Sequence, residues 1–270
     1  MSSDPFVQFK AVQRDGWGLF APVEMLTTTA AGHLVNYAGV RAGAKVLDVA
    51  CGTGVVAITA ARIGAVVSGL DLSPVLLERA KHNATLSELP IEFTEGDAEA
   101  LPHADATFDV VLSQFGHMFA PRPDVAVKEM LRVLKPGGRI AFSTWPPELF
   151  TGHMFTLVAK YMPSPPADAP KPAPPAAWGE PSVVRERLGN AVTSVEFMRE
   201  EMRAPMMSVR HSRHFFETTV GPIAKLIAVA PPEKVSQFRA EFEQAMADYF
   251  DPIANVLRQH FLMTRALKRA

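Results

Sequence analysis

The residues best suited to bind a ligand surround a short turn that contains two glycines. Asp48 lies at the end of the apolar run 45–49, and Gly52 and Gly54 follow it closely. Glycines allow the backbone to approach a ligand, and the amides at the start of a following helix attract anionic groups. A carboxylate beside these amides repels a second anion but attracts a cation. The pattern therefore indicates a ligand that carries an ammonium group beside a carboxylate.

Two further acids end the next two apolar runs. Asp71 follows the run 65–70, where a carboxylate can accept both ribose hydroxyls, and Asp97 follows the run from 91, where it could meet an adenine edge. S-adenosylmethionine combines these groups. Each feature also has a structural interpretation: the glycines as a plain turn, Asp71 as a helix cap and Asp97 as a turn residue. Gly52, Gly54 and Ala57 also satisfy the loose dinucleotide fingerprint, so an NAD(P)-dependent oxidoreductase stays an alternative.

Alternating strand-like and helix-like segments between residues 45 and 145 would position these residues. This alternation predicts βαβ units and a parallel sheet, in which ligands bind at the carboxyl ends of the strands. The run FDVVLS, 108–113, is typical of a strand covered on both faces. The predicted strands are 45–49, 65–70, 91–97, 108–113 and 139–144. One predicted helix follows the glycine turn and ends near residue 62, and two others span 75–81 and 123–134. Residues 135–138 end the last of these helices.

The flanking segments are interpreted as parts of the same single domain, 1–270. Residues 1–44 would form a helical cap, 45–145 the cofactor-binding core, and 146–270 an acceptor cap with insertions and the last strands. Eight prolines between Pro163 and Pro181 predict a stiff, extended segment that wraps the pocket mouth as an acceptor lid. The later predicted helices are 150–161, 182–188, 214–228 and 233–250, and the later strands are 194–203 and part of 253–268.

Composition excludes several classes of protein. The formal net charge is −1, which argues against a dedicated nucleic-acid binder, and no apolar run approaches the roughly 20 residues of a membrane span. A single cysteine, Cys51, excludes an internal disulfide and a multi-thiolate zinc site, and no metal is expected. The first residues lack the pattern of a signal peptide, which predicts a cytoplasmic protein. Whether the chain is a monomer or a homodimer is left open.

Five segments together resemble the class I S-adenosylmethionine-dependent methyltransferases. They are VLDVACGTG (46–54), GLDLSP (69–74), GDAEALP (96–102), FDVVLSQFG (108–116) and LRVLKPGGRI (131–140). Within that class they are most similar to the branch of the ubiquinone and menaquinone biosynthesis methyltransferases. The resemblance implies an α/β, Rossmann-like, seven-stranded sheet with helices on both faces, an antiparallel last strand and a mostly helical cap.

The resemblance also implies a set of cofactor contacts. S-adenosylmethionine would be the cofactor and S-adenosylhomocysteine the product. Many members of the class carry a third glycine where this chain has Ala50. The implied contacts are Asp48, Ala50, Gly52 and Gly54 around the methionine part, Asp71 and Leu72 around the ribose and adenine, Asp97 and Ala98 around the adenine, and Ser113 with Gln114 at the fourth strand. Cys51, Ser73 and Glu99 are also predicted to bind the cofactor.

The predicted reaction is in-line methyl transfer to a small, apolar or aromatic molecule, for which alignment supplies much of the rate. A base is needed only for a protonated acceptor, and His117 is the candidate, with His33, His153, His211 and His214 as alternatives. Trp17, His117, His153 and Trp178 are predicted to line the acceptor site or its lid. Methionines and phenylalanines predict its apolar walls: Met154, Phe155, Met162, Met198, Met202, Met206, Met207, Phe215 and Phe216. A non-catalytic sensor of the cofactor is the second alternative.

Overall fold

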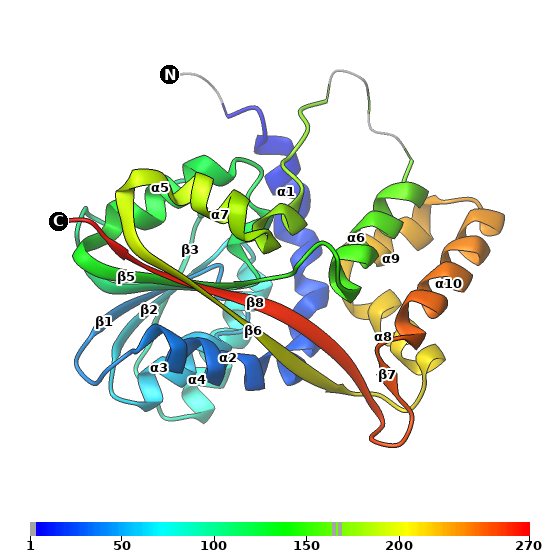
Figure 1. The fold of residues 1–270 in the computed structure, drawn as a ribbon, viewed down its shortest axis with the longest axis horizontal. Coiled ribbons are helices and arrows are strands. Elements are labelled where there is room, and N and C mark those ends of the chain that lie inside the picture. The colour runs from blue at the N-terminus through cyan, green and yellow to red at the C-terminus, as the bar shows by residue number, and fades with distance from the viewer. Residues whose placement is uncertain (1–3, 164–165, 167–168) are drawn as a thin grey trace.

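The computed structural model describes residues 4–163, 166 and 169–270, which fold around one sheet (Figure 1). The strands are β1 Lys45–Val49, β2 Val66–Asp71, β3 Glu92–Glu95, β4 Phe108–Gln114, β5 Leu134–Thr144, β6 Val192–Pro205, β7 Phe250–Asp251 and β8 Val256–Lys268. The α-helices are α1 Val7–Gly16, α2 Glu24–Ala38, α3 Val55–Arg62, α4 Pro74–Leu86, α5 Pro123–Val133, α6 Phe150–Tyr161, α7 Pro181–Leu188, α8 Val209–Thr219, α9 Gly221–Val229 and α10 Pro232–Ala247. The 3₁₀ helices are η1 Trp17–Val23, η2 His117–Phe119, η3 Pro175–Gly179 and η4 Gly189–Ala191.

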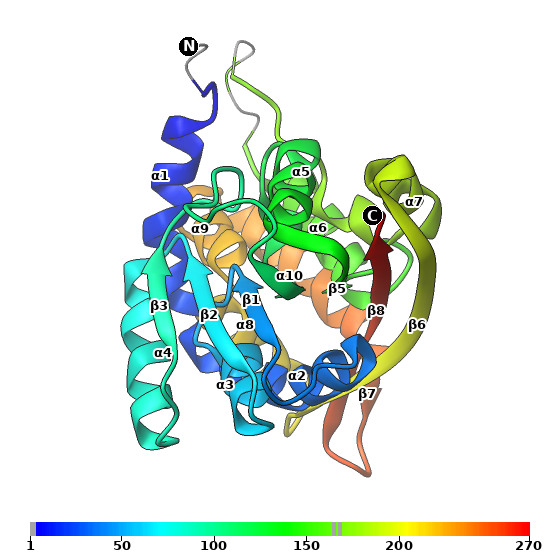
Figure 2. The same ribbon diagram turned by 90° about the vertical axis from the view of Figure 1, so that its left-hand side faces the viewer.

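Seven strands follow the order β3-β2-β1-β4-β5-β8-β6 across the sheet (Figure 2). Strands β1 to β5 pair in parallel, and β8 runs antiparallel between β5 and β6. This arrangement confirms the predicted seven-stranded sheet with an antiparallel last strand. The two-residue β7 pairs with β8 outside this order as an eighth strand.

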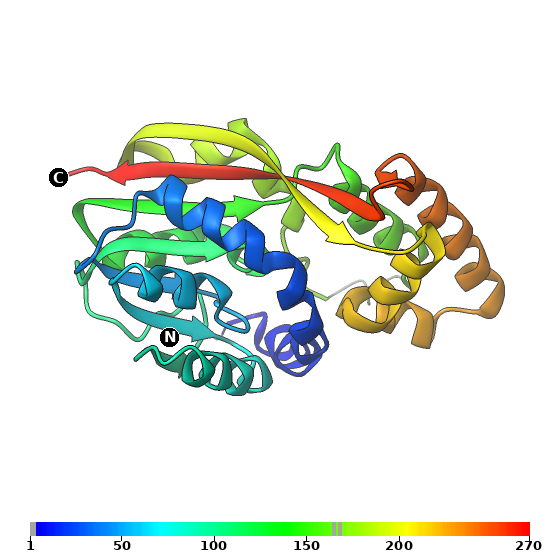
Figure 3. The ribbon, with the colours of Figure 1, turned by 90° about the horizontal axis from the view of Figure 1, so that it is seen from below.

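Helices cover both faces of the sheet, and a separate group extends beyond its carboxyl end. Helices α2, α3 and α4 contact one face, whereas α5 and α7 cover the other (Figures 1 and 3). Helices α6, α8, α9 and α10 pack on one another beyond the carboxyl ends of the parallel strands (Figure 3). The core follows the strands: Leu47, Val111 and Leu112 are completely buried, as the apolar runs predict. None of the helices in the described part of the chain is long and apolar enough to cross a membrane.

Two sequence-based boundaries were wrong, and the reason is local. The segment predicted as one helix over 214–228 forms two helices, α8 and α9, separated at Val220. Pro222 lacks an amide hydrogen and is tolerated only in a first helical turn, so a new helix begins at Gly221. The strand predicted to begin at residue 139 begins at Leu134 instead. Residues 135–138 lie inside β5 and shift its register against β4 between the pairs Phe108–Leu134 and Val110–Arg139.

The proline-rich segment ends against the sheet. Trp178 is 1% exposed, and its carbonyl oxygen accepts a hydrogen bond of 2.9 Å from Thr144 Oγ1 on β5. A Cβ atom on Gly179 would lie 2.3 Å from the Trp145 carbonyl oxygen, so only glycine fits there. Residues 164, 165, 167 and 168 of the predicted lid lie outside the described residues. The part that the structure describes is anchored in the core near Trp178.

We therefore expect Gly179→Ala to lower the free energy of unfolding by about 3 kcal/mol, because backbone atoms of Trp145 and Pro146 must move. Gly32→Ala on α2 is the matched control: apart from its chain neighbours and the nearby backbone of its own helix, no atom lies within 4 Å of its added Cβ. Its helix should gain up to about 1 kcal/mol. Urea unfolding of the three proteins measures both changes, and equal stability of Gly179→Ala and the parent would contradict the packing described for this residue.

Candidate active site

One large cavity opens at the carboxyl ends of the parallel strands, between the sheet and helices α6, α8 and α9. Its volume is about 1560 Å³ including its open mouth. We name two parts of its lining. The strand-end wall comprises Asp48, Ala50, Cys51, Gly52, Asp71, Leu72, Asp97, Ala98 and Gln114, and the cap wall comprises Trp145, Thr151, Met154, Phe155, Met202, Phe215, Phe216, Val220, Pro222 and Gln259.

The turn after β1 adopts a left-handed backbone at three positions. Gly52 and Gly54 have φ angles of 55° and 82°, and Ala50 has a φ of 54°. An alanine is strained in this conformation, and glycine would suit the position better. The same region is closely packed: a Cβ on Gly116 would lie 2.5 Å from the Ala50 side chain. Ala50 and Gly52 of this turn belong to the lining of the cavity.

Asp48 is 1% exposed, and its two carboxylate oxygens differ in their partners. Its Oδ2 accepts a hydrogen bond of 3.0 Å from the amide of Ala57, in the first turn of α3. Its Oδ1 has no partner in the described part of the chain. Burial raises the pKa of Asp48 to about 8; the bond from Ala57 opposes this shift, and the nearby charge of Asp71 adds to it. A cationic group in the cavity would satisfy the free oxygen and favour the ionised carboxylate.

Asp71 holds the same turn from the adjacent strand. It accepts hydrogen bonds of 2.8 Å from the amides of Gly52 and Ser73. Burial raises the pKa of Asp71, although the bonds from Ser73, Gly52 and Leu72 oppose this shift. Each carboxylate oxygen has a second lone pair, so a carboxylate with two amide partners can still accept two hydroxyl groups. Asp71 lines the cavity, as the sequence predicts for a ribose contact.

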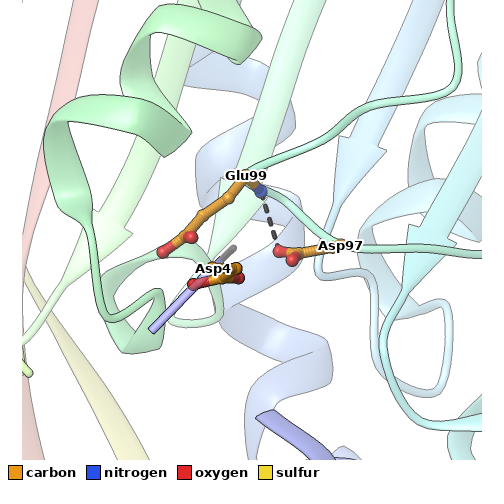
Figure 4. Close-up of side chains that lie close together, drawn as sticks. All are labelled: Asp4, Asp97 and Glu99. Carbon is orange, nitrogen blue, oxygen red and sulfur yellow. Dashed lines mark hydrogen bonds between the residues drawn. The ribbon is translucent and has the colours of Figure 1, made fainter. Parts of the chain in front are cut away.

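Asp97 belongs to a cluster of three acids that encloses a lysine. Lys10 Nζ on α1 lies 2.6 Å from Asp97 Oδ2, 2.6 Å from Glu99 Oε2 and 2.7 Å from Asp4 Oδ2. Figure 4 shows the three carboxyl groups close together, with the Glu99 amide donating to Asp97. The ammonium of Lys10 offsets part of the negative charge at the centre of this cluster. Lys10 also lines the cavity, a contact that the prediction of a helical segment over 1–44 did not include.

Four of the predicted cofactor residues support the wall from behind instead of lining it: Gly54, Ser73, Glu99 and Ser113. Ser113 is completely buried; its hydroxyl donates to the carbonyl of Val49 at 2.7 Å and accepts the amide of His117. Glu99 accepts hydrogen bonds from Lys10 and from Arg122. The remaining predicted residues form the strand-end wall, with Gln114 donating to the carbonyl of Thr27.

The structure places the predicted base outside the cavity. His117 is buried between Phe142 and Trp178, with ring centroids 4.6 and 4.7 Å away, and does not line the cavity. Burial, with the positive charge of Arg187, lowers the pKa of His117 to about 3, so its ring is neutral near pH 7. His153 is exposed and Trp178 is buried, and neither lines the cavity. None of the eight histidines contributes to the lining.

Apolar side chains form most of the cap wall. Met154, Phe155, Met202, Phe215 and Phe216 lie on it as predicted, whereas Met162, Met198, Met206 and Met207 do not. Trp17 from η1 lines the cavity as expected and lies against Phe119, with ring centroids 4.7 Å apart.

Sequence reasoning missed several residues of the lining. Phe115 follows β4 and stacks on Trp145, with ring centroids 3.9 Å apart. Both residues end parallel strands, so the rule that ligands bind at carboxyl ends could have identified them. Thr151 and Gln259 carry no sequence signal of this kind, because only the folded chain brings α6 and β8 to the cavity.

Comparisons with known proteins identify relatives of the whole chain and of its core. The family described as "Methyltransferase domain" matches residues 47–142. The chain is similar to an uncharacterised protein of Mycobacterium tuberculosis, with 35% identity over 239 residues that cover 87% of this chain and 85% of that protein. It is also similar to the ubiquinone biosynthesis O-methyltransferase of Escherichia coli, with 35% identity over 146 residues, 52% of this chain and 60% of that enzyme.

Among solved structures, the YcgJ protein from Bacillus subtilis has the same fold. It superposes with a TM-score of 0.59 at 18% identity, over 90% of this chain and 99% of that one. At this level of identity the likeness concerns the fold alone.

The burial of Asp48 predicts a pH-dependent stability. The folded-state pKa of about 8 exceeds the usual 3.8, so the folded chain keeps a proton that the unfolded chain releases. Stability is therefore lost as the pH rises from about 4 to 8, by up to about 1.4 kcal/mol per pH unit. Asp48→Asn does not titrate, and we expect its stability advantage over the parent to grow across this range.

Urea unfolding of the ligand-free proteins at pH 5, 6, 7, 8 and 9 measures this difference. Asp15→Asn is the matched control for net charge, because the side chain of Asp15 is 85% exposed. A difference between Asp48→Asn and the parent that stays constant from pH 5 to 8 would show that Asp48 is ionised throughout.

Proposed function

Because this chain belongs to the class I S-adenosylmethionine-dependent methyltransferases, we propose that its strand-end wall holds the cofactor and its cap wall holds a small, apolar or aromatic acceptor. The observation that carries the proposal is the buried Oδ1 of Asp48, which has no partner among the described residues and belongs to a side chain of the cavity lining. The ammonium of the cofactor's methionine part supplies the partner that this oxygen lacks. Membership of the family favours methyl transfer over hydride transfer and over a sensor without activity.

Three carboxylates can divide the cofactor among them. Asp48 would bind the ammonium, Asp71 the two ribose hydroxyls, and Asp97 with the neighbouring Ala98 the adenine. Asp97 Oδ1 accepts the Glu99 amide at 2.8 Å and Oδ2 faces Lys10, so this acid is held in place before any ligand arrives. The close approach of the backbone at Ala50 and Gly52 completes the wall.

When bound, S-adenosylmethionine supplies an electrophilic methyl group on its sulfonium sulfur. The protein has to align the acceptor atom with that methyl group and to exclude water, and such alignment can contribute several kcal/mol. Trp17, Phe119 and Phe155 place aromatic rings around the space between the two walls. We propose that these rings exclude water from the reacting atoms.

The division of the chain into one core and two caps is supported by the origin of the lining. Residues 1–44 contribute Lys10, Trp17 and Phe20, and residues 146–270 contribute the cap wall beyond Trp145. We propose that these segments select the acceptor, whereas 45–145 binds the cofactor. A small molecule suits a cap wall without charged side chains better than a nucleic acid, whose recognition needs basic groups. A cytoplasmic location stays a prediction from the sequence.

Cofactor binding provides the direct test. We expect Asp71→Ala to weaken the binding of S-adenosylhomocysteine at least tenfold, since each buried polar contact is worth about 1–3 kcal/mol. Isothermal titration calorimetry measures the change, and Asp15→Ala on α1 is the control for loss of a carboxylate. Circular dichroism verifies that the variant is folded. Undiminished affinity of the folded variant, or binding of NAD without binding of S-adenosylhomocysteine, would contradict the proposed function.

A further inference from the structure

Two neutral polar side chains interrupt the apolar cap wall. Thr151 in the first turn of α6 is 6% exposed and Gln259 on β8 is 4% exposed, and both line the cavity. Thr151 Oγ1 and Gln259 Nε2 lack a hydrogen-bond partner among the residues that the structure describes. Burying a polar atom without a partner is destabilising. Because both residues also line the cavity, a ligand there can supply the missing partners.

Gln259 is a polar residue at a position where the strand pattern places buried apolar side chains. On β8, Leu257, Gln259 and Phe261 alternate with less buried residues, so all three belong to the buried face of the strand. Gln259 lies directly opposite Met202 of β6, and opposite residues of paired strands share a face. Met202 also lines the cavity. An apolar side chain would suit this position for packing, so the amide favours a role in ligand recognition.

The distribution of charge restricts the ligand further. The charged lining residues are Lys10 and Glu24 from the N-terminal segment, with Asp48, Asp71 and Asp97 from the strand-end wall. Every member of the cap wall is uncharged. An ionised group buried without a counter-charge is strongly unfavourable. The cap wall therefore suits a ligand part that is uncharged.

From these observations we infer that Thr151 and Gln259 are the recognition residues for the methyl acceptor, which is an uncharged molecule with an apolar body and a carbonyl, hydroxyl or ether oxygen. This inference rests on the proposed function. The Gln259 amide donates to the oxygen, and the Thr151 hydroxyl donates or accepts. The stacked rings of Phe115 and Trp145 offer a flat surface for a planar body.

Naphthalene and two of its derivatives separate the contributions of the apolar body, the neutral oxygen and a charge. They are used as binding probes with S-adenosylhomocysteine present in saturating amount. 2-Acetylnaphthalene carries a neutral carbonyl, naphthalene carries no polar group, and 2-naphthoate carries a charge. Equilibrium dialysis measures the binding of each probe. We expect the acetyl compound to bind about tenfold more tightly than naphthalene, the value of one good hydrogen bond, and 2-naphthoate to bind most weakly.

The variants Thr151→Val and Gln259→Met remove the polar atoms and keep side-chain size. Each variant should bind 2-acetylnaphthalene up to about tenfold more weakly than the parent does. Naphthalene should bind each variant as tightly as it binds the parent, or more tightly. Gln259→Met should also raise the melting temperature of the ligand-free protein by a few degrees, because the unsatisfied amide is gone. Thr264→Val is the matched control: Thr264 lies on β8, is completely buried and also has an unpartnered hydroxyl, but it does not line the cavity.

Equal losses for both neutral probes, an unchanged preference in both variants, tighter binding of 2-naphthoate, or failure of 2-acetylnaphthalene to bind the parent would each overturn the inference. The proposed function is tested separately by S-adenosylhomocysteine itself. Binding of S-adenosylhomocysteine without discrimination among the probes would refute only the recognition residues, whereas failure of S-adenosylhomocysteine to bind would refute the proposed function.

Discussion

Two buried carboxylates hold the turn that follows β1, and the cavity depends on them. Asp71 of β2 accepts the amide of Gly52 within the turn, and Asp48 of β1 accepts the amide of Ala57 in the first turn of α3. The turn and the helix that follows it are thus tied to two different strands. These bonds keep the backbone in its left-handed course despite the strain at Ala50. They also place two acids of raised pKa at one edge of the sheet. A cationic, hydroxyl-rich ligand would supply partners for both buried carboxylates, so stability and binding are linked at the same atoms.

The two walls divide recognition between different parts of the chain. The strand-end wall comes from a continuous core whose residues lie close in sequence, whereas the cap wall combines α6, β6, α8, α9 and β8. Acids concentrate on the first wall and aromatic rings and methionines on the second. Lys10 joins the N-terminal helix to the core through the acids near β3, which places Trp17 beside the cavity. Substitutions in the caps could therefore alter the acceptor while the cofactor contacts stay intact.

Local patterns sufficed where neighbours in sequence are also neighbours in space. The strand 45–49 and the helix 150–161 match β1 and α6, and the acids at the ends of β1 and β2 and after β3 line the cavity. His117 shows where such reasoning ends, because a residue that follows a strand can point toward the ligand or into the core. The ring of His117 lies in the core because it packs against Phe142 and Trp178, which come from distant segments. Lys10 and Gln259 escaped prediction for the same reason: their partners are a cluster and a cavity that exist only after folding.

The position of β8 has a consequence for how the molecule is made. This strand is later in the chain than both of its neighbours, yet it lies between them in the sheet. A growing chain that has emerged only as far as α10 therefore exposes the unpaired edges of β5 and β6, and such edges promote aggregation. The N-terminal half could form its parallel core early, while β6 must wait for residues 256–268. During synthesis the acceptor side of the cavity is thus completed last, and a nascent chain is most vulnerable to mispairing in the interval before β8 inserts.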